Sequence, residues 1–172
     1  VIETAATKPF GFTPFYPGPG LGGHCIPIDP FYLTWKAKQV GVKTRFIELA
    51  GEVNTNMPKW ILEKAALELM NRGKNISESK VLILGMAYKK NVDDLRESPS
   101  LELIRLLSEL GVNADYHDFY IPKLHHTRKH SFDKSSINLD ESIGNYDLVI
   151  LSTDHDQYDY EFLQKNSKLI VD

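Results

Sequence analysis

The feature that most constrains the fold is a short apolar run, Lys80-Val81-Leu82-Ile83-Leu84-Gly85, which a glycine closes. An unbroken apolar run of this length is typical of a strand buried on both faces, as in a parallel sheet. Similar runs recur downstream, with helical patterns between them. This alternation predicts an α/β fold, a doubly wound parallel sheet flanked by helices. The expected strands lie at 80–85, 112–117, 147–151 and 168–171, and the expected helices at 98–110, 139–146 and 160–164. Ser98 and Pro99 are the expected N-cap and first residue of the helix at 98–110, and Gly111 is its expected C-cap. The polar, basic-leaning residues 119–136 are expected to form a loop.

The earlier part of the chain shows helical patterns and no strand pattern. Residues 30–40 predict a short helix that ends at Gly41. A second helix is expected over about 56–72, with Pro58 in its first turn, where a missing N–H is harmless. The chain is therefore divided into residues 1–50 and residues 51–172. Core packing is the favoured interpretation of the aromatic residues of the first helix, Phe31, Tyr32 and Trp35.

The most distinctive stretch runs from Tyr16 to Pro30 and holds the only cysteine, Cys25. Its glycines let the backbone approach a ligand closely and adopt positive φ. Asp29 and Pro30 predict the N-cap and first residue of a helix, so the thiol would lie just before a helix N-terminus, a location that favours the thiolate. Asp29 is placed to position a water or accept a proton. Cys25 is thus a candidate nucleophile, and the alternative is a small packed side chain in a turn-rich loop.

The segment after the first expected strand carries a second set of ligand signals. A doubly wound sheet binds ligands at the carboxyl ends of its strands. The turn has one glycine, Gly85, and lacks the G-x-G-x-x-G pattern, so it does not predict dinucleotide binding. Lys89, Lys90 and Arg96 are candidates for phosphate contacts because of their charge and, for arginine, its fork of donors. The alternative is a solvated loop, which is the more common role of such a cluster.

Charge and composition exclude several classes of function. The net charge of −3 argues against a nucleic-acid binder, and no apolar run is long enough to span a membrane. A single cysteine and an N-terminus without a signal-peptide layout predict a reducing, cytoplasmic location. The histidines at 125, 126 and 130 fit no zinc spacing, so no metal is expected.

Two motifs carry a resemblance to a known family. The run Gly-Gly-His-Cys-Ile-Pro-Ile-Asp-Pro-Phe-Tyr-Leu, residues 22–33, resembles the active-site segment of the UDP-glucose/GDP-mannose dehydrogenase family, and residues 17–37 look most like its bacterial UDP-N-acetylglucosamine 6-dehydrogenases. The resemblance implies that Cys25 attacks the C6 aldehyde of a UDP-sugar, that hydride transfer to NAD gives a thioester, and that Asp29 assists release of the uronic acid. It also implies a loop that wraps the sugar nucleotide, formed by Tyr16, Pro17, Gly18, Pro19, Gly20, Leu21 and Gly22.

The run from Gly85 to Pro99 resembles the same family. It implies a Rossmann-like UDP-binding domain in which Tyr88 and Lys89 contact the UDP moiety and Arg96 reaches the nicotinamide cofactor. The family's NAD-binding domain would lie upstream, so the chain reads as a C-terminal fragment, without dehydrogenase activity of its own. In the related animal enzymes an arginine lent by the neighbouring subunit falls about where Lys8 or Pro9 stands here, and of these two only Lys8 could substitute for it.

The resemblance further implies that the first helical part belongs to a segment that builds a homodimer, so some of its aromatic surface would be an interface. The partners expected are a UDP-sugar and NAD, for the synthesis of a cell-surface polysaccharide precursor. A different class of function remains open, a nucleotide-binding or assembly module without catalysis. The motifs do not decide which UDP-sugar is the substrate.

Overall fold

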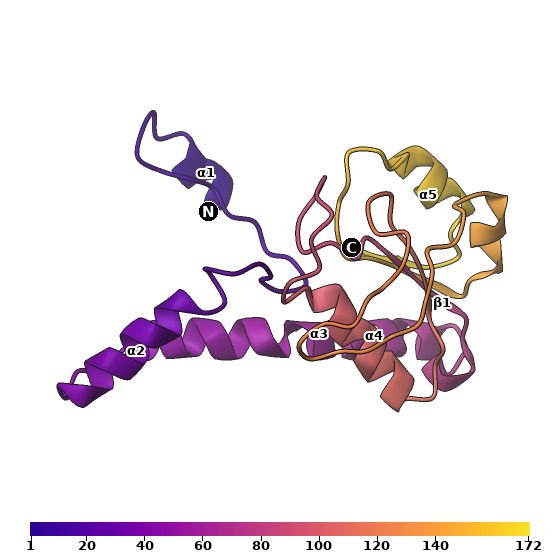
Figure 1. Cartoon of the computed structure of the whole chain (residues 1–172). Helices are drawn as coiled ribbons and strands as arrows, with labels where there is room; N and C mark the ends of the chain where they lie inside the picture. Colours follow the sequence, from indigo (N-terminus) through magenta and orange to yellow (C-terminus); the bar gives the residue numbers. More distant parts are fainter.

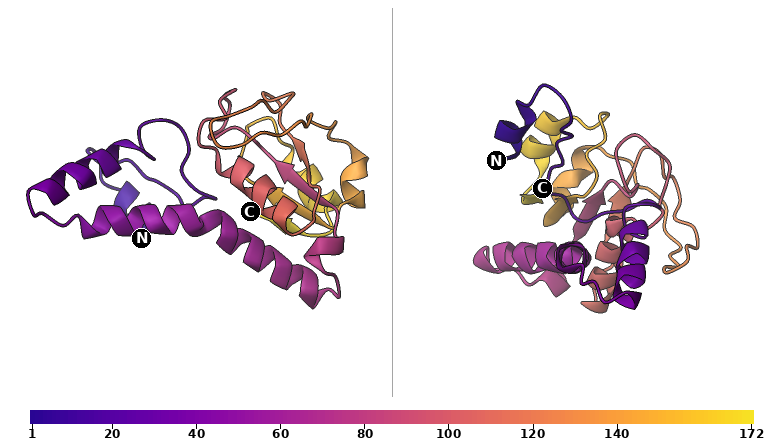
Figure 2. Two further views of the ribbon diagram at one scale, coloured as in Figure 1. Left: turned by 60° about the horizontal axis from the view of Figure 1, so that its bottom comes forward. Right: turned by 90° about the vertical axis from the view of Figure 1, so that its left-hand side faces the viewer.

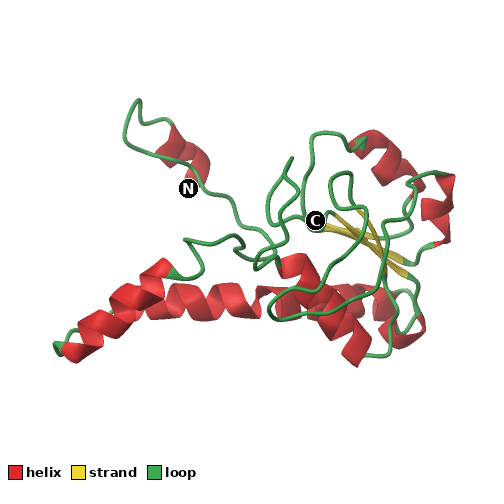
Figure 3. Cartoon of the chain, in the orientation of Figure 1, coloured by secondary structure: helices red, strands yellow, loops and turns green.

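The structure, a computed structural model, describes residues 1–172 and has two parts, a helical arm and a unit built on a sheet (Figures 1 and 3). The arm is made by α2 and the first half of α3, which lie side by side and extend away from the sheet (Figure 1). The elements in chain order are α1 (Ile2–Ala6), α2 (Asp29–Gln39), α3 (Arg45–Asn71), η1 (Ile76–Glu78), β1 (Val81–Leu84), α4 (Pro99–Glu109), β2 (Asp115–His117), η2 (Glu141–Asn145), β3 (Leu148–Leu151), α5 (Tyr160–Asn166) and β4 (Ile170–Val171).

The four strands form one parallel sheet in the order β2-β1-β3-β4, which confirms the predicted fold class. The chain runs from β1 to β2 on one side and then crosses to β3 on the other side of β1. The strand order therefore reverses between β1 and β3, and the crevice outside the carboxyl ends of such strands is where ligands bind in open α/β sheets. The residues that leave β1 and β3 there are Gly85 and Ser152.

Both faces of the sheet are covered, as the apolar runs predict (Figure 2). On one face Val81 and Ile83 pack in a core with α3 and α4, which supply side chains such as Leu69 and Leu103. On the other face Leu82 and Leu84 pack in a smaller core with η2 and α5. Alternate residues of β1 thus belong to opposite cores, because successive side chains of a strand point to opposite faces.

The start of α4 follows its sequence signals. The Ser98 hydroxyl accepts a hydrogen bond from the N–H of Ser100, and Pro99 is the first helical residue, so the predicted N-cap and N1 positions are confirmed. At the other end Gly111 has φ +80°, the left-handed conformation that glycine adopts without strain. The Ser98 hydroxyl also donates a hydrogen bond of 2.7 Å to the carbonyl of Met86, which ties the N-terminus of α4 to the segment that leaves β1.

The prediction for the second helix is wrong at its start. α3 begins at Arg45, not near residue 56, and Pro58 lies in its interior. Because proline has no N–H, the carbonyl of Asn54 loses its helical partner, yet the helix continues to Asn71 with Pro58 buried. The predicted boundary between residues 50 and 51 falls inside this continuous helix, so α3 is shared between the arm and the sheet unit.

The aromatic residues of α2 do not form a core. Tyr32 and Trp35 are 68% and 63% exposed, and the largest part of the surface of α2 faces solvent, so the core interpretation is wrong. Only Phe31 packs within the arm, with its ring against Gly51 of α3, where a Cβ would lie 2.6 Å from a ring carbon. The arm is also joined by the Thr44–Thr34 hydroxyl hydrogen bond of 3.0 Å and by the Lys38–Glu48 ion pair of 2.6 Å. No helix in the structure has the length and apolar character needed to cross a bilayer.

Candidate functional site

The segment that carries Cys25 leads directly into α2. The carbonyl of Cys25 accepts hydrogen bonds from the N–H groups of Ile28, at 3.1 Å, and Asp29, at 2.8 Å, so a tight turn joins the cysteine to the helix. The Cys25 side chain is exposed, as a nucleophile must be to meet a substrate. Asp29 is the first residue of α2 and Ile28 is its N-cap, so the predicted capping role of Asp29 is wrong. Its carboxylate makes no capping hydrogen bond and lies exposed one turn from Cys25.

The glycine-rich part of this segment docks on the segment that follows β1. The N–H of Gly23 donates a hydrogen bond of 2.8 Å to the carbonyl of Arg96. A Cβ on Gly22 would overlap Tyr88 and lie 3.0 Å from the carbonyl oxygen of Glu97. Gly23 has φ +88°, and a Cβ there would lie 3.0 Å from a carbon of the Tyr88 ring. The glycines therefore permit a close approach, as predicted, but what they approach is protein, the second motif of the sequence.

Gly20 makes a similar contact one step earlier in the segment. It packs against Pro99, the first residue of α4. A Cβ added to Gly20 would lie only 3.1 Å from the Cβ of Pro99. The structure thus brings together two motifs that lie about 65 residues apart in the chain. Tyr16, Pro17, Gly18, Pro19 and Leu21 follow an irregular path beside them, and Tyr16 and Leu21 remain exposed.

Tyr88 and Lys89 project from the turn after β1. Tyr88 is half-buried against the glycines, and the Lys89 ammonium lies 5.8 Å from the centroid of the Tyr88 ring, within the range of a cation–π contact. The Lys89 side chain is exposed and has no carboxylate partner within salt-bridge distance. An unpaired ammonium beside an aromatic face is suited to a phosphate-bearing ring ligand.

Arg96 is held in place by Asp94. Its Nε lies 2.9 and 3.0 Å from the two carboxylate oxygens, and its Nη2 lies 2.6 Å from Oδ2. The hydrogen bond from Arg96 lowers the pKa of Asp94, and the Asp94 carboxylate raises the pKa of Arg96, with smaller contributions from Tyr88 and Cys25. The paired guanidinium is therefore held in one place, on the segment against which Gly23 docks.

A cavity lies beside the glycine-rich segment. It has a volume of about 1000 Å³ and is bounded by that segment, by α3, by the start of α4 and by residues 125–130. Arg96 lines this cavity, whereas Cys25, Tyr88 and Lys89 do not. The neighbours of Cys25 in the chain, His24 and Ile26, do line it, and the lining also includes the basic side chain of Arg128.

Residues 125–130 lie in the stretch predicted to be a loop, and the sequence did not predict that they line this cavity. They form the tip of a hairpin that the Lys123–Ser135 bridge closes, and Leu124 anchors it in the core. Lys129 pairs with Glu97, and burial lowers the pKa of His130. The basic composition of this stretch was the only signal in the sequence. The structure brings no three His, Cys, Asp or Glu side chains together in a metal-binding arrangement.

The turn that follows β1 differs from a dinucleotide-binding turn in what its backbone N–H groups bind. In a nucleotide-binding Rossmann turn, backbone N–H groups at the start of the turn face a pyrophosphate. Here the N–H groups of Met86 and Ala87 both donate to a carboxylate of the protein itself, Asp118, at 2.6 and 3.0 Å. The turn is therefore already occupied by an internal anion, and its residues do not fit NAD.

Comparisons with known proteins agree with this geometry. Residues 1–56 match the model of the UDP-glucose/GDP-mannose dehydrogenase family, central domain, and residues 82–172 match that family's UDP binding domain. The chain is 38% identical over 142 residues to UDP-N-acetyl-D-mannosamine dehydrogenase of Methanococcus maripaludis, which covers 83% of this chain and 30% of that protein. It is 30% identical over 158 residues to UDP-N-acetyl-D-glucosamine 6-dehydrogenase of Pseudomonas aeruginosa, which covers 92% of this chain and 36% of that one.

Solved structures give the same picture. The UDP-D-ManNAc dehydrogenase from Pyrococcus horikoshii superposes with a TM-score of 0.77 and 27% identity, over 98% of this chain and 38% of that one. A GDP-mannose dehydrogenase from Pseudomonas aeruginosa superposes with a TM-score of 0.68 and 26% identity, over 90% of this chain and 36% of that one. The chain thus spans about a third of the length of the relatives that it matches.

Proposed function

Because this chain belongs to the UDP-glucose/GDP-mannose dehydrogenase family, we propose that it is the C-terminal portion of a UDP-sugar 6-dehydrogenase. The proposed substrate is UDP-N-acetylglucosamine or a related UDP-N-acetylhexosamine, oxidised at C6 to the uronic acid for a cell-surface polysaccharide. The observation that carries the proposal is the docking of the Cys25 segment on the Tyr88–Pro99 segment through Gly22 and Gly23. This contact supports the proposal because it joins the segment that carries Cys25 to the segment that carries Tyr88, Lys89 and Arg96.

In this proposal Cys25 does the covalent chemistry. Its thiolate adds to the C6 aldehyde to give a thiohemiacetal, and after oxidation at C6 the same sulfur carries the acyl group as a thioester. Asp29, on the same turn, accepts a proton from the water that hydrolyses the thioester. The Lys89 ammonium and the Tyr88 ring bind the UDP moiety, and residues 16–22 cover the sugar.

NAD supplies the oxidising power in this proposal, since two hydrides must leave C6. The sheet of this chain does not fit NAD, because Asp118 occupies the turn that would face the pyrophosphate. The cofactor would be held by parts of the longer enzyme outside these residues, and Arg96 is the residue of this chain that would reach it. We therefore expect the 172-residue chain alone to form no NADH with UDP-N-acetylglucosamine.

The whole enzyme is proposed to be a homodimer built through the arm. The first half of α3 and α2 expose apolar side chains that have no partner within this chain, including Trp35, Phe46 and Leu49. Such a patch on a water-soluble surface marks a site of protein association. A second copy of the same arm is the proposed occupant.

The test of the catalytic role is made in the full-length enzyme, with UDP-N-acetylglucosamine, UDP-N-acetylmannosamine and UDP-N-acetylgalactosamine as substrates. Cys25→Ala is expected to lower turnover by at least about 10³-fold with little loss of UDP-sugar binding, because Tyr88 and Lys89 are untouched. Asp29→Asn is expected to slow thioester hydrolysis, which intact-protein mass would show as an acylated enzyme. The matched control is Lys36→Ala, an exposed position of α2 away from the segment. Turnover of Cys25→Ala at the wild-type rate would show that Cys25 is not the nucleophile.

A further inference from the structure

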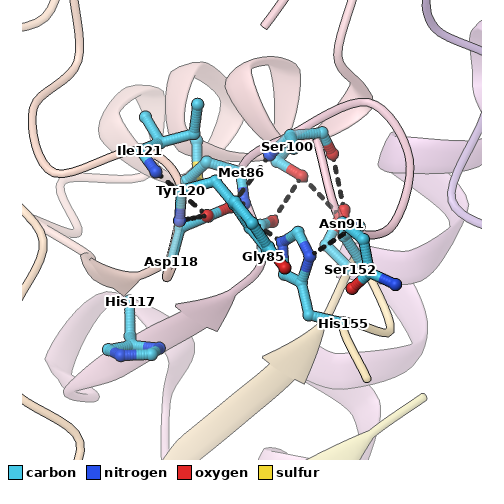
Figure 4. A network of polar contacts seen from close by, with 12 residues as sticks. Gly85, Met86, Asn91, Ser100, His117, Asp118, Tyr120, Ile121, Ser152 and His155 are labelled. Carbon is cyan, nitrogen blue, oxygen red and sulfur yellow. Dashed lines mark hydrogen bonds and ion pairs between the residues drawn. The ribbon is translucent and has the colours of Figure 1, made fainter. Parts of the chain in front are cut away.

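A buried pair of titratable residues lies at the carboxyl edge of the sheet, and the proposed chemistry does not use it (Figure 4). Asp118 follows β2 and His155 follows β3, and both side chains are completely buried. The pair occupies the crevice where the strand order reverses, between the ends of β1 and β3. Burying a carboxylate costs free energy unless hydrogen bonds compensate it, so this arrangement calls for a function.

The Asp118 carboxylate is fully compensated. Its Oδ2 accepts from the N–H groups of Met86 and Ala87 and from His155 Nε2, at 3.1 Å, while its Oδ1 accepts from Tyr120, at 2.7 Å, and Ile121, at 3.1 Å. Burial alone would raise the pKa of Asp118, but the hydrogen bonds from His155 and these backbone groups hold it below its ordinary value. A stable carboxylate thus ties the end of β2 to the first two residues after Gly85.

His155 extends the connection to the far end of the same turn. Its Nδ1 accepts a hydrogen bond of 2.9 Å from the backbone N–H of Asn91. Because Nδ1 accepts a hydrogen bond and Nε2 faces a carboxylate, the imidazole is assigned the neutral tautomer with its proton on Nε2. The imidazole is therefore a bridge between Asp118 and Asn91, and both of its nitrogens are used.

Asn91 needs such support because its backbone is unusual. It has φ +62°, which is uncommon for a residue other than glycine. Its side chain is also fixed, with Nδ2 donating to Asp156 at 2.6 Å and the Asp156 N–H donating back to Oδ1 at 3.2 Å. At the near end, the Thr153 hydroxyl donates to the carbonyl of Ala87 at 2.6 Å. The turn is pinned at Met86–Ala87 and at Asn91, and Tyr88 and Lys89 lie between the two pins.

We propose that Asp118 and His155 are positioning residues that hold the Met86–Asn91 turn in the one conformation that presents Tyr88 and Lys89 to the phosphates of a nucleotide. Asp118 fixes the start of the turn, and His155 transmits that constraint to Asn91. The nucleotide part of this inference rests on the proposed function, since it takes UDP as the ligand. The constraint on the turn rests on the hydrogen bonds alone.

Two amide variants separate the two halves of the imidazole. His155→Asn places an oxygen near the position of Nδ1, so it can accept from Asn91 but does not reach Asp118. His155→Gln places an amide nitrogen near the position of Nε2, so it can donate to Asp118 but offers Asn91 no acceptor. Both variants leave one buried contact unmade, so both are expected to lower thermal stability to a similar extent.

The test measures backbone amide hydrogen exchange at Asn91 and the affinity for UDP in the 172-residue chain. We expect His155→Gln to expose the Asn91 amide to exchange and to weaken UDP binding about tenfold, and His155→Asn to retain both properties near wild type. The matched control is His117→Gln, at a buried histidine of the same edge that contacts Tyr158 and not the turn. It is expected to leave Asn91 and UDP affinity unchanged.

Equal behaviour of the Asn and Gln variants at Asn91 would overturn the positioning role, because a purely structural histidine would make no distinction between them. A wild-type chain that protects Asn91 but binds no UDP would count against the proposed UDP site instead. A His155→Gln chain with an unprotected Asn91 and unchanged UDP affinity would show that the turn is constrained but that this constraint does not serve binding, and would overturn the inference.

Discussion

The two halves of α3 carry similar apolar patterns and have opposite surroundings. From Pro58 onward the helix buries Leu62, Ala65 and Leu69 against the sheet and α4. Before Pro58 no residue of the helix is buried, and Phe46 is 88% exposed. One continuous helix is thus a core element at one end and an unpartnered surface at the other.

The apolar periodicity of a helix therefore predicts that one of its faces will be covered, but it does not predict whether the same chain or another subunit covers that face. In the sheet unit the cover is supplied by the same chain, within one closed core. In the arm, the neighbouring α2 covers part of the face, and the exposed remainder is what a second subunit of the proposed homodimer would bury. Substitutions in the two regions should therefore act on different observables, stability for the sheet unit and association for the arm.

The largest effect is expected from Gly85→Ala. Gly85 has φ +83° and a Cβ there would lie 2.5 Å from the Thr153 carbonyl oxygen, so strain and overlap combine. We expect a loss of at least about 3 kcal/mol in the free energy of unfolding, or failure to fold. The matched control is Gly41→Ala in the arm, with φ +76° and open space around it. The control should shift the main urea transition little, and equal losses from both variants would contradict the contrast between the regions.

A second pair of substitutions compares the core with the arm directly. Leu103→Ala, at a fully buried position of α4, should cost about 2–5 kcal/mol of stability. Phe46→Ala should change the stability of the single chain by less than about 0.5 kcal/mol, because its ring is exposed. It should instead weaken self-association of the chain in sedimentation experiments. A large stability loss from Phe46→Ala without any change in association would show that the arm is a folded core in its own right.

Much of the sheet unit could be predicted from local signals. The run at 80–85, the Ser98-Pro99 pair and Gly111 each act through interactions with their sequence neighbours, and each was placed correctly. The start of α3 could not be predicted in this way. A proline normally marks the first turn of a helix, whereas Pro58 lies buried in the interior of α3, a place that no signal near it in the sequence indicates.

The candidate site divides along the same line. Cys25 and Tyr88 belong to motifs that the sequence displays as continuous runs, so they could be singled out. The partners Asp118 and His155 come from different strand ends and carry no local motif, so only the fold brings them together. The sequence predicted that the glycines allow a close approach to the backbone, but it did not predict that Tyr88 of the same chain fills the space they leave.

A smaller effect concerns pH and belongs to the sheet unit alone. Burial lowers the pKa of His117, with Asp118 opposing and His155 adding to the shift. The folded state therefore keeps His117 neutral, and below about pH 6.5 the unfolded chain binds a proton that the folded chain does not. Stability should fall as pH drops from about 7.5 to 5.5. His117→Gln should reduce this dependence by up to about 1 kcal/mol in urea titrations. An unchanged slope would show that His117 is protonated equally in both states.

Two segments that are distant in the sequence, residues 20–23 and residues 86–91, are proposed to form one nucleotide half-site. The most direct measurement is a titration of the isotopically labelled chain with UDP, followed by backbone amide NMR. The account predicts that the amides of residues 20–23 and those of residues 86–91 shift together with one dissociation constant, and that Lys89→Gln weakens both sets equally. Shifts confined to residues 125–130, on the opposite wall of the cavity that the glycine-rich segment also lines, or no shifts in the glycine-rich segment would contradict it.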